Sequence, residues 1–346
     1  MKILVTGGTG FIGSHSAAAL TRAGHDVRLL VRDAEKAKRT FESLGTAVPE
    51  TVTGDVTDAD AVGEALEGCE GVLHAAALVS LDASRAEQVA RTNFGGTKNV
   101  VGMAQERGLG PIVYVSSVSA LFDPGKGRIG PDSAPSHQAG NAYSASKART
   151  EAFVRGLQAA GAPVAITYPS GVLGPHAPSL TEVHRALPVQ LRVGLLTEGG
   201  IAFVDVRDVA AAHAAIFARA PGPSRFITSS HDLTWHEVAD LLGELTGRRI
   251  RRVRVPGPLL RGFGRLGDLA KRFVSFDFPL TYEGMTTATR WPGVDASATE
   301  RELGVSFRHP RETLADTLRW MGEAGHVAPE PLGHLAPAGR PRLKAG

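Results

Sequence analysis

Short apolar runs alternate with amphipathic stretches along the first half of the chain. Nearly continuous runs of Val, Ile and Leu predict six strands, at residues 2–6, 26–31, around 52, 71–76, 111–115 and 163–168. Apolar residues at helical spacing between them predict helices, at residues 14–23, 34–44, 58–66, 85–107 and 143–160. Strands of this kind separated by helices indicate a parallel sheet covered on both faces. The pattern therefore predicts an α/β fold, a doubly wound parallel sheet of the Rossmann type, with its ligand crevice beyond the carboxyl ends of the strands.

This alternation stops after residue 174, and the remaining pattern predicts a smaller, mostly helical C-terminal subdomain that closes the crevice and selects the substrate. We expect a dinucleotide-binding core and a substrate-binding cap, made respectively of residues 1–174 plus 200–228 and of residues 175–199 plus 229–323. The Pro/Gly-rich basic tail, residues 324–346, has little apolar surface to bury and is expected to be flexible.

One stretch of the predicted cap, Leu259–Phe273, carries leucines and phenylalanines at helical spacing against arginines. A basic amphipathic helix of this kind can lie on a membrane surface. Packing of the apolar face against the crevice, with the arginines in solvent, is the favoured interpretation. The cap is rich in aromatic residues, which suggest a less polar pocket than a sugar nucleotide would need: Phe263, Phe273, Phe276, Phe278, Tyr282 and Trp291.

Composition narrows the classes of protein that the chain can belong to. Its 346 residues, 42% of them hydrophobic, can bury a large core, and a formal net charge of only +3 predicts no nucleic-acid partner. The single cysteine, Cys69, excludes an internal disulfide and is expected to be a small buried side chain. No apolar run reaches the length of a membrane span, so we expect a cytoplasmic protein without stable membrane insertion. The twelve histidines form no close trio with carboxylates, and no metal site is predicted.

A glycine-rich turn joins the first predicted strand to the first predicted helix. Gly7, Gly10 and Gly13 give the spacing G-x-x-G-x-x-G in the strand–turn–helix context that a dinucleotide-binding motif requires. Gly7 permits the sharp turn, Gly10 the approach of a pyrophosphate, and Gly13 close packing of helix on strand. The N–H groups at the start of the helix then face the phosphates. The turn residues predicted to bind the cofactor are Gly7, Thr9, Gly10, Phe11, Ile12 and Gly13.

The end of the second strand discriminates between the two nicotinamide cofactors. An NAD site has an acidic residue there, which binds the ribose hydroxyls. This chain has Val31 at that position, followed by Arg32, whose guanidinium can pair with a 2′-phosphate. Asp33 leaves the alternative open, because it can cap the next helix or bind the ribose. We therefore expect NADP(H) in preference to NAD(H), with Asp55 and Val56 bordering the adenine.

A second group of residues carries acid–base chemistry. Tyr143 and Lys147 are spaced i, i+4, so a phenol and an ammonium share one helix face. The ammonium favours the phenolate and brings a phenol, whose ordinary pKa is about 10, nearer to working range. The fifth strand ends at Ser117, whose hydroxyl can hold a substrate carbonyl in the same crevice, with Ser116 and Ser119 as rival candidates.

These motifs together resemble the extended short-chain dehydrogenase/reductase superfamily, in its NAD-dependent epimerase/dehydratase-like group, over residues 1 to about 321. The further matching motifs are His74–Ala77, Asn93–Thr97, Pro169–Pro175 and Phe203–Val209. Within the superfamily, the second strand and Arg32 are similar to the dihydroflavonol-4-reductase and 3β-hydroxysteroid-dehydrogenase branch, whose members reduce ketones with NADPH. No acidic pair follows Ser117, and Tyr168 replaces an arginine that is common in sugar-modifying relatives.

The resemblance implies roles for individual residues. Tyr143 would be the general acid/base, Lys147 would lower its pKa and hold the nicotinamide ribose, Ser117 would orient the substrate, and Asn93 would support the proton relay. The further residues implied to line the cofactor are Ala75, Ala76, Ala77, Pro169, Ser170, Gly171 and Val172. The residues expected to touch the substrate are Ser119, Phe122 and Val172.

The sequence thus predicts an NADP(H)-dependent oxidoreductase that interconverts a carbonyl and an alcohol on a small, fairly apolar molecule. Two alternatives stay open: an NAD-dependent sugar-nucleotide epimerase, and a non-catalytic dinucleotide-binding sensor. The Ser117, Tyr143 and Lys147 set argues against the sensor, since binding alone does not need it. The resemblance also implies a homodimer built through the helices at 85–107 and 143–160.

Overall fold

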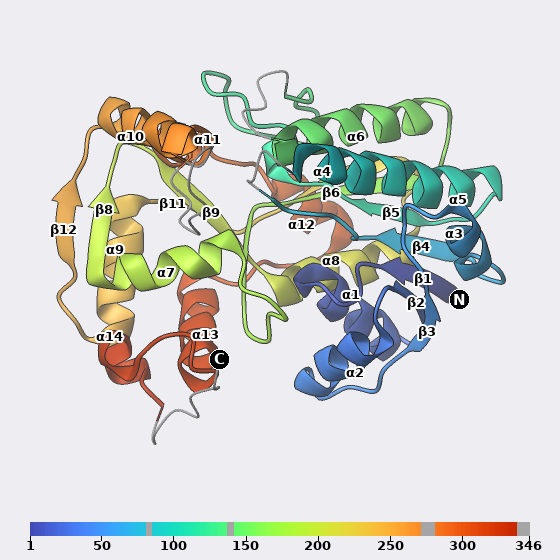
Figure 1. The fold of residues 1–346 in the computed structure, drawn as a ribbon, viewed down its shortest axis with the longest axis horizontal. Coiled ribbons are helices and arrows are strands. Elements are labelled where there is room, and N and C mark those ends of the chain that lie inside the picture. The colour runs from blue at the N-terminus through green and yellow to red at the C-terminus, as the bar shows by residue number, and fades with distance from the viewer. Residues whose placement is uncertain (81–84, 137–141, 271–280, 338–346) are drawn as a thin grey trace.

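The computed structural model describes residues 1–80, 85–136, 142–270 and 281–337. Its core is a sheet of seven parallel strands in the order β10-β6-β5-β4-β1-β2-β3 (Figure 1). In chain order the strands are β1 (Lys2–Thr6), β2 (Asp26–Val31), β3 (Glu50–Thr53), β4 (Gly71–His74), β5 (Ile112–Val115), β6 (Val164–Pro169) and β10 (Ser224–Thr228). This is the predicted doubly wound sheet, and its strand order reverses direction between β1 and β4, where such sheets bind their ligands.

Helices cover both faces of the sheet (Figure 1). One face carries α1 (Phe11–Arg22), α2 (Ala34–Ser43) and α8 (Val206–Arg219). The opposite face carries α3 (Ala59–Ala65), α4 (Ala86–Ala90), α5 (Met103–Glu106) and α6 (Ala142–Ala159). The predicted helix at 85–107 passes from α4 to α5 through two π-helical segments, Arg91–Gly95 and Lys98–Gly102.

The second half of the chain builds the part drawn on the left of Figure 1. Its helices are α7 (Glu182–Arg192), α9 (Trp235–Thr246), α10 (Gly257–Ala270), α11 (Tyr282–Arg290) and α13 (Pro310–Glu323), while α12 (Ser297–Leu303) packs back on β10. Two small sheets add to it: β7 (Gly171–Leu173), β9 (Gly200–Asp205) and β11 (Asp232–Thr234) form one, and β8 (Val193–Leu196) and β12 (Arg251–Arg254) form the other. The segment 248–254, which includes β12, contains five arginines and was not predicted as a strand.

Local capping follows the sequence signals. Thr234 and Glu237, spaced as Thr-x-x-Glu, form a capping box at the start of α9, and Asp205 caps α8 by accepting the Arg207 N–H. Asp208 does not complete that cap, since it binds the backbone N–H of Arg308 at 2.7 Å. Cys69 is buried as expected, and its burial raises the pKa of the thiol.

The prediction of a flexible tail from residue 324 is wrong for residues 324–337. Helix α14 (Pro329–Leu332) and the 3-10 turn Gly333–Leu335 follow α13 directly. Leu332 is fully buried and Leu335 nearly so, in the apolar cluster that α9 and α13 also supply. A few well-placed leucines therefore anchor a segment whose composition suggested disorder. Residues 338–346 lie outside the described chain.

The prediction that the apolar face of the helix at 259–273 packs inward is also wrong. In α10 the buried positions are Gly257, Leu260, Gly264 and Gly267, whereas the other large apolar side chains are exposed: Leu259, Phe263, Leu266 and Leu269. Gly264 explains this arrangement, because a Cβ there would lie 2.7 Å from the Thr281 carbonyl oxygen. The glycine-rich face is the only one that can approach α11 so closely. Phe273, Phe276 and Phe278 lie outside the described residues.

Candidate active site

The predicted phosphate cradle forms at the turn between β1 and α1. Gly7 has φ +75°, and a Cβ on it would lie 2.6 Å from the backbone of Ala75 and Ala76, so only glycine is tolerated there. A Cβ on Gly13 would lie 2.2 Å from the Gly7 carbonyl oxygen, so this glycine lets α1 begin against the strand. Gly10 differs: among the described atoms only the Gly7 oxygen lies within 4 Å of its built Cβ, at 3.2 Å.

The space in front of Gly10 is therefore open to a ligand. Helix α1 begins at Phe11 rather than at Ser14 as predicted, and its N-cap Gly10 offers no side-chain cap. The first turn also has no acidic residue, so its N–H groups and the positive end of the helix dipole are available to an anion. These features fit the pyrophosphate of a dinucleotide, with Thr9, Phe11 and Ile12 beside it.

Arg32 and Asp33 adopt different roles at the end of β2. Asp33 is the N-cap of α2, and its carboxylate accepts the Lys36 N–H at 2.9 Å. Arg32 extends into solvent with 76% of its side chain exposed, and its guanidinium lies 3.8 Å from Asp55. Asp55 accepts hydrogen bonds from the backbone and hydroxyl of Thr57, which fix its carboxylate below Arg32. An exposed guanidinium at this position can reach a 2′-phosphate.

Ser117 and Tyr143 converge beyond the carboxyl end of β5. Ser119 donates its hydroxyl proton to the Ser117 oxygen at 2.9 Å, and its backbone N–H points to the same oxygen at 3.2 Å. Because the Ser117 oxygen accepts both, its own proton is free for a third partner. Burial raises the pKa of Tyr143 to about 12, and a hydrogen bond with Ser117 opposes this increase. Without the cofactor, Tyr143 is therefore a protonated phenol, which is the form that donates a proton.

Lys147 lies one helical turn further along α6, almost fully buried. Its ammonium donates to the Val115 carbonyl at 2.8 Å and lies 5.2 Å from the centre of the Tyr114 ring. Burial lowers the pKa of Lys147 to about 8, and the negative charge of Glu151 opposes this decrease. The ammonium is thus still the main form near neutral pH, and it lies at the end of β5, one helical turn from Tyr143 along α6.

The structure separates Ser117 from its rival Ser116. Ser116 donates to the Glu151 carboxylate at 2.8 Å on the buried side of α6. Glu151, which is 0% exposed, also accepts from the Tyr168 phenol at 2.5 Å and from Arg155 at 2.7 Å. Glu151 was not among the predicted site residues, although its spacing of i+4 from Lys147 could have indicated it. Tyr168 was noted only as a departure from sugar-modifying relatives.

Asn93 is buried in the first π-helical segment and ties three elements together. Its amide accepts from the Leu78 N–H at 2.7 Å, and its amide nitrogen donates to the Leu78 carbonyl at 3.1 Å and to Ser146 at 2.8 Å. The π-turn is what brings this side chain toward α6, and such turns are frequent at functional sites. Asn93 thus fixes the chain after β4 against the helix that carries Tyr143 and Lys147.

His74 is a packing residue, as expected. Its Nδ1 lies 2.7 Å from the Thr6 hydroxyl and its Nε2 lies 2.9 Å from the Thr97 hydroxyl. Burial, with a contribution from the Lys147 charge, lowers the pKa of His74 to about 3. The ring is neutral and both nitrogens are occupied, so it transfers no proton.

The remaining predicted residues lie around the same strand ends. Ala75, Ala76 and Ala77 follow β4 directly, and Val56 packs against Gly96. The chain from Pro169 to Val172 links β6 to β7 and is held by the Ser170 N–H, which donates to Thr228 at 3.2 Å. Val172 packs with Phe11 at the start of α1.

The predicted aromatic lining is only partly assembled. Phe122 stacks on Trp291 with ring centres 6.4 Å apart, so one aromatic pair joins the β5 loop to the cap. Phe263 is exposed on α10 and does not contribute to the lining.

No group of three His, Cys, Asp or Glu side chains suited to a metal ion occurs among the described residues. None of the helices in those same ranges is long and apolar enough to span a bilayer.

Comparison with known proteins assigns the family. The NAD dependent epimerase/dehydratase family matches residues 3–226, which contain the phosphate cradle, Ser117, Tyr143 and Lys147. The chain belongs to this family. As a member of the extended short-chain dehydrogenase/reductase superfamily, this epimerase/dehydratase-family protein is a nicotinamide-dependent oxidoreductase acting on CH–OH or carbonyl groups, as predicted.

Three curated relatives resemble this family member over most of its length. A Synechocystis sp. protein named "Putative dihydroflavonol 4-reductase" is 30% identical, over 93% of this chain and 95% of its own. "Sterol demethylase protein B" of Methylococcus capsulatus is 28% identical, over 94% and 100%. A Stigmatella aurantiaca ketoreductase of a farnesyl-dihydroquinoline oxide is 27% identical, over 95% and 98%.

Solved structures share the fold of this family member. The crystal structure of gox2253 superposes with a TM-score of 0.78 at 26% identity, over 94% of this chain and 99% of that one. A UDP-glucose-4-epimerase from Stenotrophomonas maltophila with bound NAD gives a TM-score of 0.72 at 22% identity, over 92% and 97%. The predicted superfamily and fold class are thereby confirmed.

Proposed function

We propose that this protein reduces a ketone or aldehyde on a small, fairly apolar molecule with NADPH, or runs the reverse oxidation. The observation that carries the proposal is the convergence of Ser117, Tyr143 and Lys147 beyond β5, beside the open cradle at Gly10. The names of the relatives support a reductase, and the exposed Arg32 supports NADP(H) over NAD(H).

The chain's own residues would perform the acid–base half of the reaction. The bound nicotinamide supplies or accepts the hydride at the carbinol carbon. Ser117 would hold the substrate oxygen by donating its free hydroxyl proton. Tyr143 would donate its phenolic proton to that oxygen during reduction and take it back during oxidation. Lys147 would exchange its bond to Val115 for the ribose hydroxyls and stabilise the phenolate that forms.

We also propose the division of labour between core and cap that the sequence suggested, with the substrate held between Ser119, Phe122 and Val172 of the core and the cap residues 175–199 and 229–323. The stacked Phe122 and Trp291 rings support an apolar substrate. Asn93 would act as a positioning residue, since it holds Ser146, and so the helix of Tyr143, in place.

A homodimer through the π-helical segments and α6 is part of the proposal. Phe94 and Phe153 lie on these elements with ring centres 5.8 Å apart, and Arg149 covers Phe94 at 4.0 Å. Both rings are half-buried and Arg149 is exposed, so this cluster reaches the surface where such an interface would form.

The first experiment is a titration of NADPH and of NADH, followed by a carbonyl screen with the cofactor that binds. We expect wild type to prefer NADPH, and Arg32→Ala to weaken NADPH binding about tenfold or more while leaving NADH binding unchanged, because a charge-assisted pair to the phosphate is lost. Tyr143→Phe should bind cofactor normally and lose turnover by about 10² or more.

Arg22→Ala is the matched control, since Arg22 is an exposed arginine at the far end of α1. Equal binding of both cofactors, with no effect of Arg32→Ala, would contradict the phosphate clamp. Purified protein that carries NAD and shows no net turnover would favour the epimerase, and cofactor binding with unchanged properties in Tyr143→Phe would favour a sensor.

A further inference from the structure

Helix α10 presents an apolar face to solvent. Leu259, Phe263, Leu266 and Leu269 are 51%, 46%, 62% and 51% exposed. The first three are spaced i, i+4 and i+7, so they form one continuous stripe along the helix, with Leu269 at its edge. Half of the large apolar side chains that are exposed in the described chain lie on this single helix. Such a concentration marks an interaction surface.

The helix is fixed in this orientation by its opposite face. Gly264 packs against the backbone at Thr281, with no room for a Cβ. A Cβ on Gly257 would likewise lie 2.8 Å from the side chains of Arg261 and Glu198. Arg261 donates to the Thr289 hydroxyl at 2.8 Å, and Asp268 accepts the Tyr282 N–H at 2.9 Å. These contacts prevent α10 from rolling its leucines inward, so the apolar stripe is a permanent feature of the surface.

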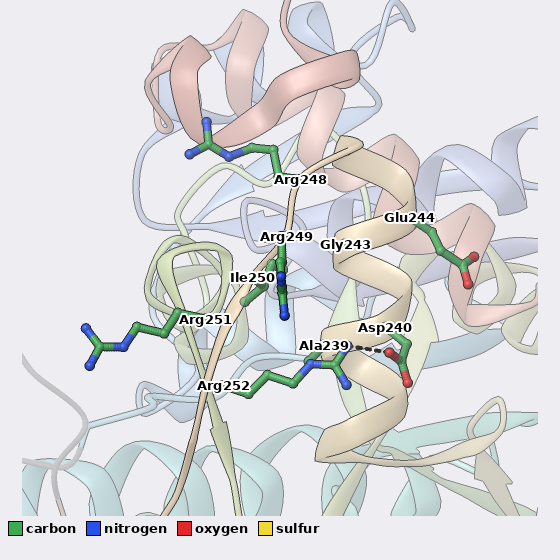
Figure 2. Close-up of a pocket in the computed structure, with 9 residues that line it drawn as sticks. All are labelled: Ala239, Asp240, Gly243, Glu244, Arg248, Arg249, Ile250, Arg251 and Arg252. Atoms are coloured by element: carbon green, nitrogen blue, oxygen red, sulfur yellow. Dashed lines mark hydrogen bonds and ion pairs between the residues drawn. The ribbon is translucent and has the colours of Figure 1, made fainter.

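An arginine-rich strand leads directly into this helix. Arg249, Arg251 and Arg254 are exposed, and within the described residues no salt bridge involves any of them. Arg252 is held by Asp240 at 2.5 Å, and Figure 2 shows it extending to one side of the strand while Arg251 extends to the other. The arginines and α9 line a surface pocket of about 830 Å³. Unpaired cations therefore lie on the segment directly before α10, whose strand β12 ends at Arg254, three residues from the start of the helix at Gly257.

We propose that α10 and the arginines around β12 bind the surface of an anionic lipid bilayer. An apolar helix face that enters the boundary between headgroups and acyl chains, beside cations that meet lipid phosphates, is how interfacial helices bind. A second copy of the chain fits this surface less well, because pairing two such faces would bring two sets of unpaired arginines together. The binding does not rest on the proposed activity.

The surface is one helix away from the candidate active site. Helix α10 packs on α11, and Glu283 of α11 accepts a hydrogen bond from Ser144, the neighbour of Tyr143 (Figure 1). A bilayer bound at α10 would thus lie near the candidate active site, and a bilayer is a reservoir for apolar carbonyl compounds.

The test is sedimentation of the full chain with vesicles of phosphatidylcholine alone and of phosphatidylcholine with phosphatidylglycerol. We expect binding to the anionic vesicles, and weaker binding as salt increases. Leu266→Glu should reduce binding about tenfold, since it places a charge in the middle of the stripe. The pair Arg251→Gln and Arg254→Gln should reduce it by about 25-fold, or roughly fivefold for each arginine.

Val48→Glu is the matched control, because Val48 is an exposed valine on the core, remote from α10. Melting temperature and cofactor binding should be the same in all variants, so a change in sedimentation reports the surface and not the fold. No sedimentation with either vesicle, or equal sedimentation with both that Leu266→Glu leaves unchanged, would overturn the proposal. A wild-type dimer in light scattering that Leu266→Glu converts to a monomer, without vesicle binding, would assign the face to a second copy.

Discussion

Glu151 supports the proposed acid–base pair of Tyr143 and Lys147 without belonging to it. It is fully buried, and three side chains donate hydrogen bonds to it: Ser116, Tyr168 and the charged Arg155. Its negative charge favours the ammonium form of Lys147, which burial alone would disfavour more strongly. Glu151 touches neither substrate nor cofactor in the proposed reaction, so it is a positioning residue.

Replacing Glu151 by Gln should therefore move the alkaline limb of the pH profile. The reducing enzyme needs Lys147 charged, so kcat/KM should fall as pH rises through the pKa of Lys147, about 8 in the protein without cofactor. Loss of the Glu151 charge lowers that pKa further, and the limb should shift to lower pH by about one unit. The measurement is kcat/KM against pH for wild type and Glu151→Gln.

Tyr168→Phe is the control, because it removes one hydrogen bond to Glu151 and leaves the charge. Its alkaline limb should coincide with that of wild type. A limb that stays in place in Glu151→Gln, or moves equally in Tyr168→Phe, would show that Glu151 acts through packing alone.

Local spacing in the sequence determines where the candidate catalytic groups lie. Tyr143 and Lys147 share a helix face, and Ser117 follows a strand whose end is fixed by the sheet. The direction of Ser116 and the role of Glu151 depend instead on which side of α6 is buried. That is set by packing on β5 and β6, which a single sequence does not reveal.

Helices and strands were predicted correctly where the apolar periodicity was clear. The predictions failed where glycines decided which helix face is buried, or where charged residues interrupted the apolar pattern of a strand. The strand β2 has its predicted bounds, and the α9 capping box forms as the Thr234 and Glu237 spacing indicated. In α10 the small residues, and not the leucines, decide which face is buried. The strand β12 is mostly exposed and carries arginines on both sides, so it has no apolar pattern to detect.

Helix α14 gives a prediction at this scale. Leu332 is fully buried against α13, where it contacts Gly322, so Leu332→Ala should lower the free energy of unfolding by about 2–4 kcal/mol. The measurement is urea unfolding at equilibrium. Val48→Ala, on an exposed side chain, should change it by less than about 0.5 kcal/mol. If both variants changed the free energy of unfolding equally little, the segment after residue 324 would be flexible, as the composition suggested.

The whole molecule follows from its repeated βα units, and this is why the fold was predictable. The central strands β4, β5 and β6 are buried along their whole length, so helices must cover both faces of the sheet. The arrangement of the cap depends on contacts between distant segments, such as α11 with α6, that no local pattern encodes.

Buried histidines predict how the whole molecule responds to acid. Burial lowers the pKa of His74 and His213 to about 3, and that of His15 and His184 to about 4. Unfolded histidine has a pKa of about 6.5, so below this pH the unfolded chain binds protons that the folded chain does not. The free energy of unfolding should therefore fall as pH falls below 6.5, by about 1.4 kcal/mol per pH unit for each histidine.

Urea unfolding between pH 6.5 and 5.5 measures this slope. His213→Gln should reduce the change over this range by about 1 kcal/mol, because one titrating group is lost and an unfolded histidine is already half protonated at pH 6.5. Val48→Ala, at an exposed side chain that does not titrate, should leave the slope as in wild type. Equal slopes in wild type and His213→Gln would show that His213 is already protonated in the fold.

The pairing of α1 with α8 has a consequence for how the chain folds as it is made. These helices pack side by side on one face of the sheet, and Ser16 of α1 bonds to His213 of α8 at 2.8 Å, although 197 positions separate the two residues. The last strand of the sheet, β10, follows α8. A nascent chain that has emerged only as far as β6 must hold the apolar side of α1 uncovered until α8 arrives. Nonlocal closure of this kind slows folding, and chaperone binding to ribosome-held chains should be strongest for those that end between β6 and α8.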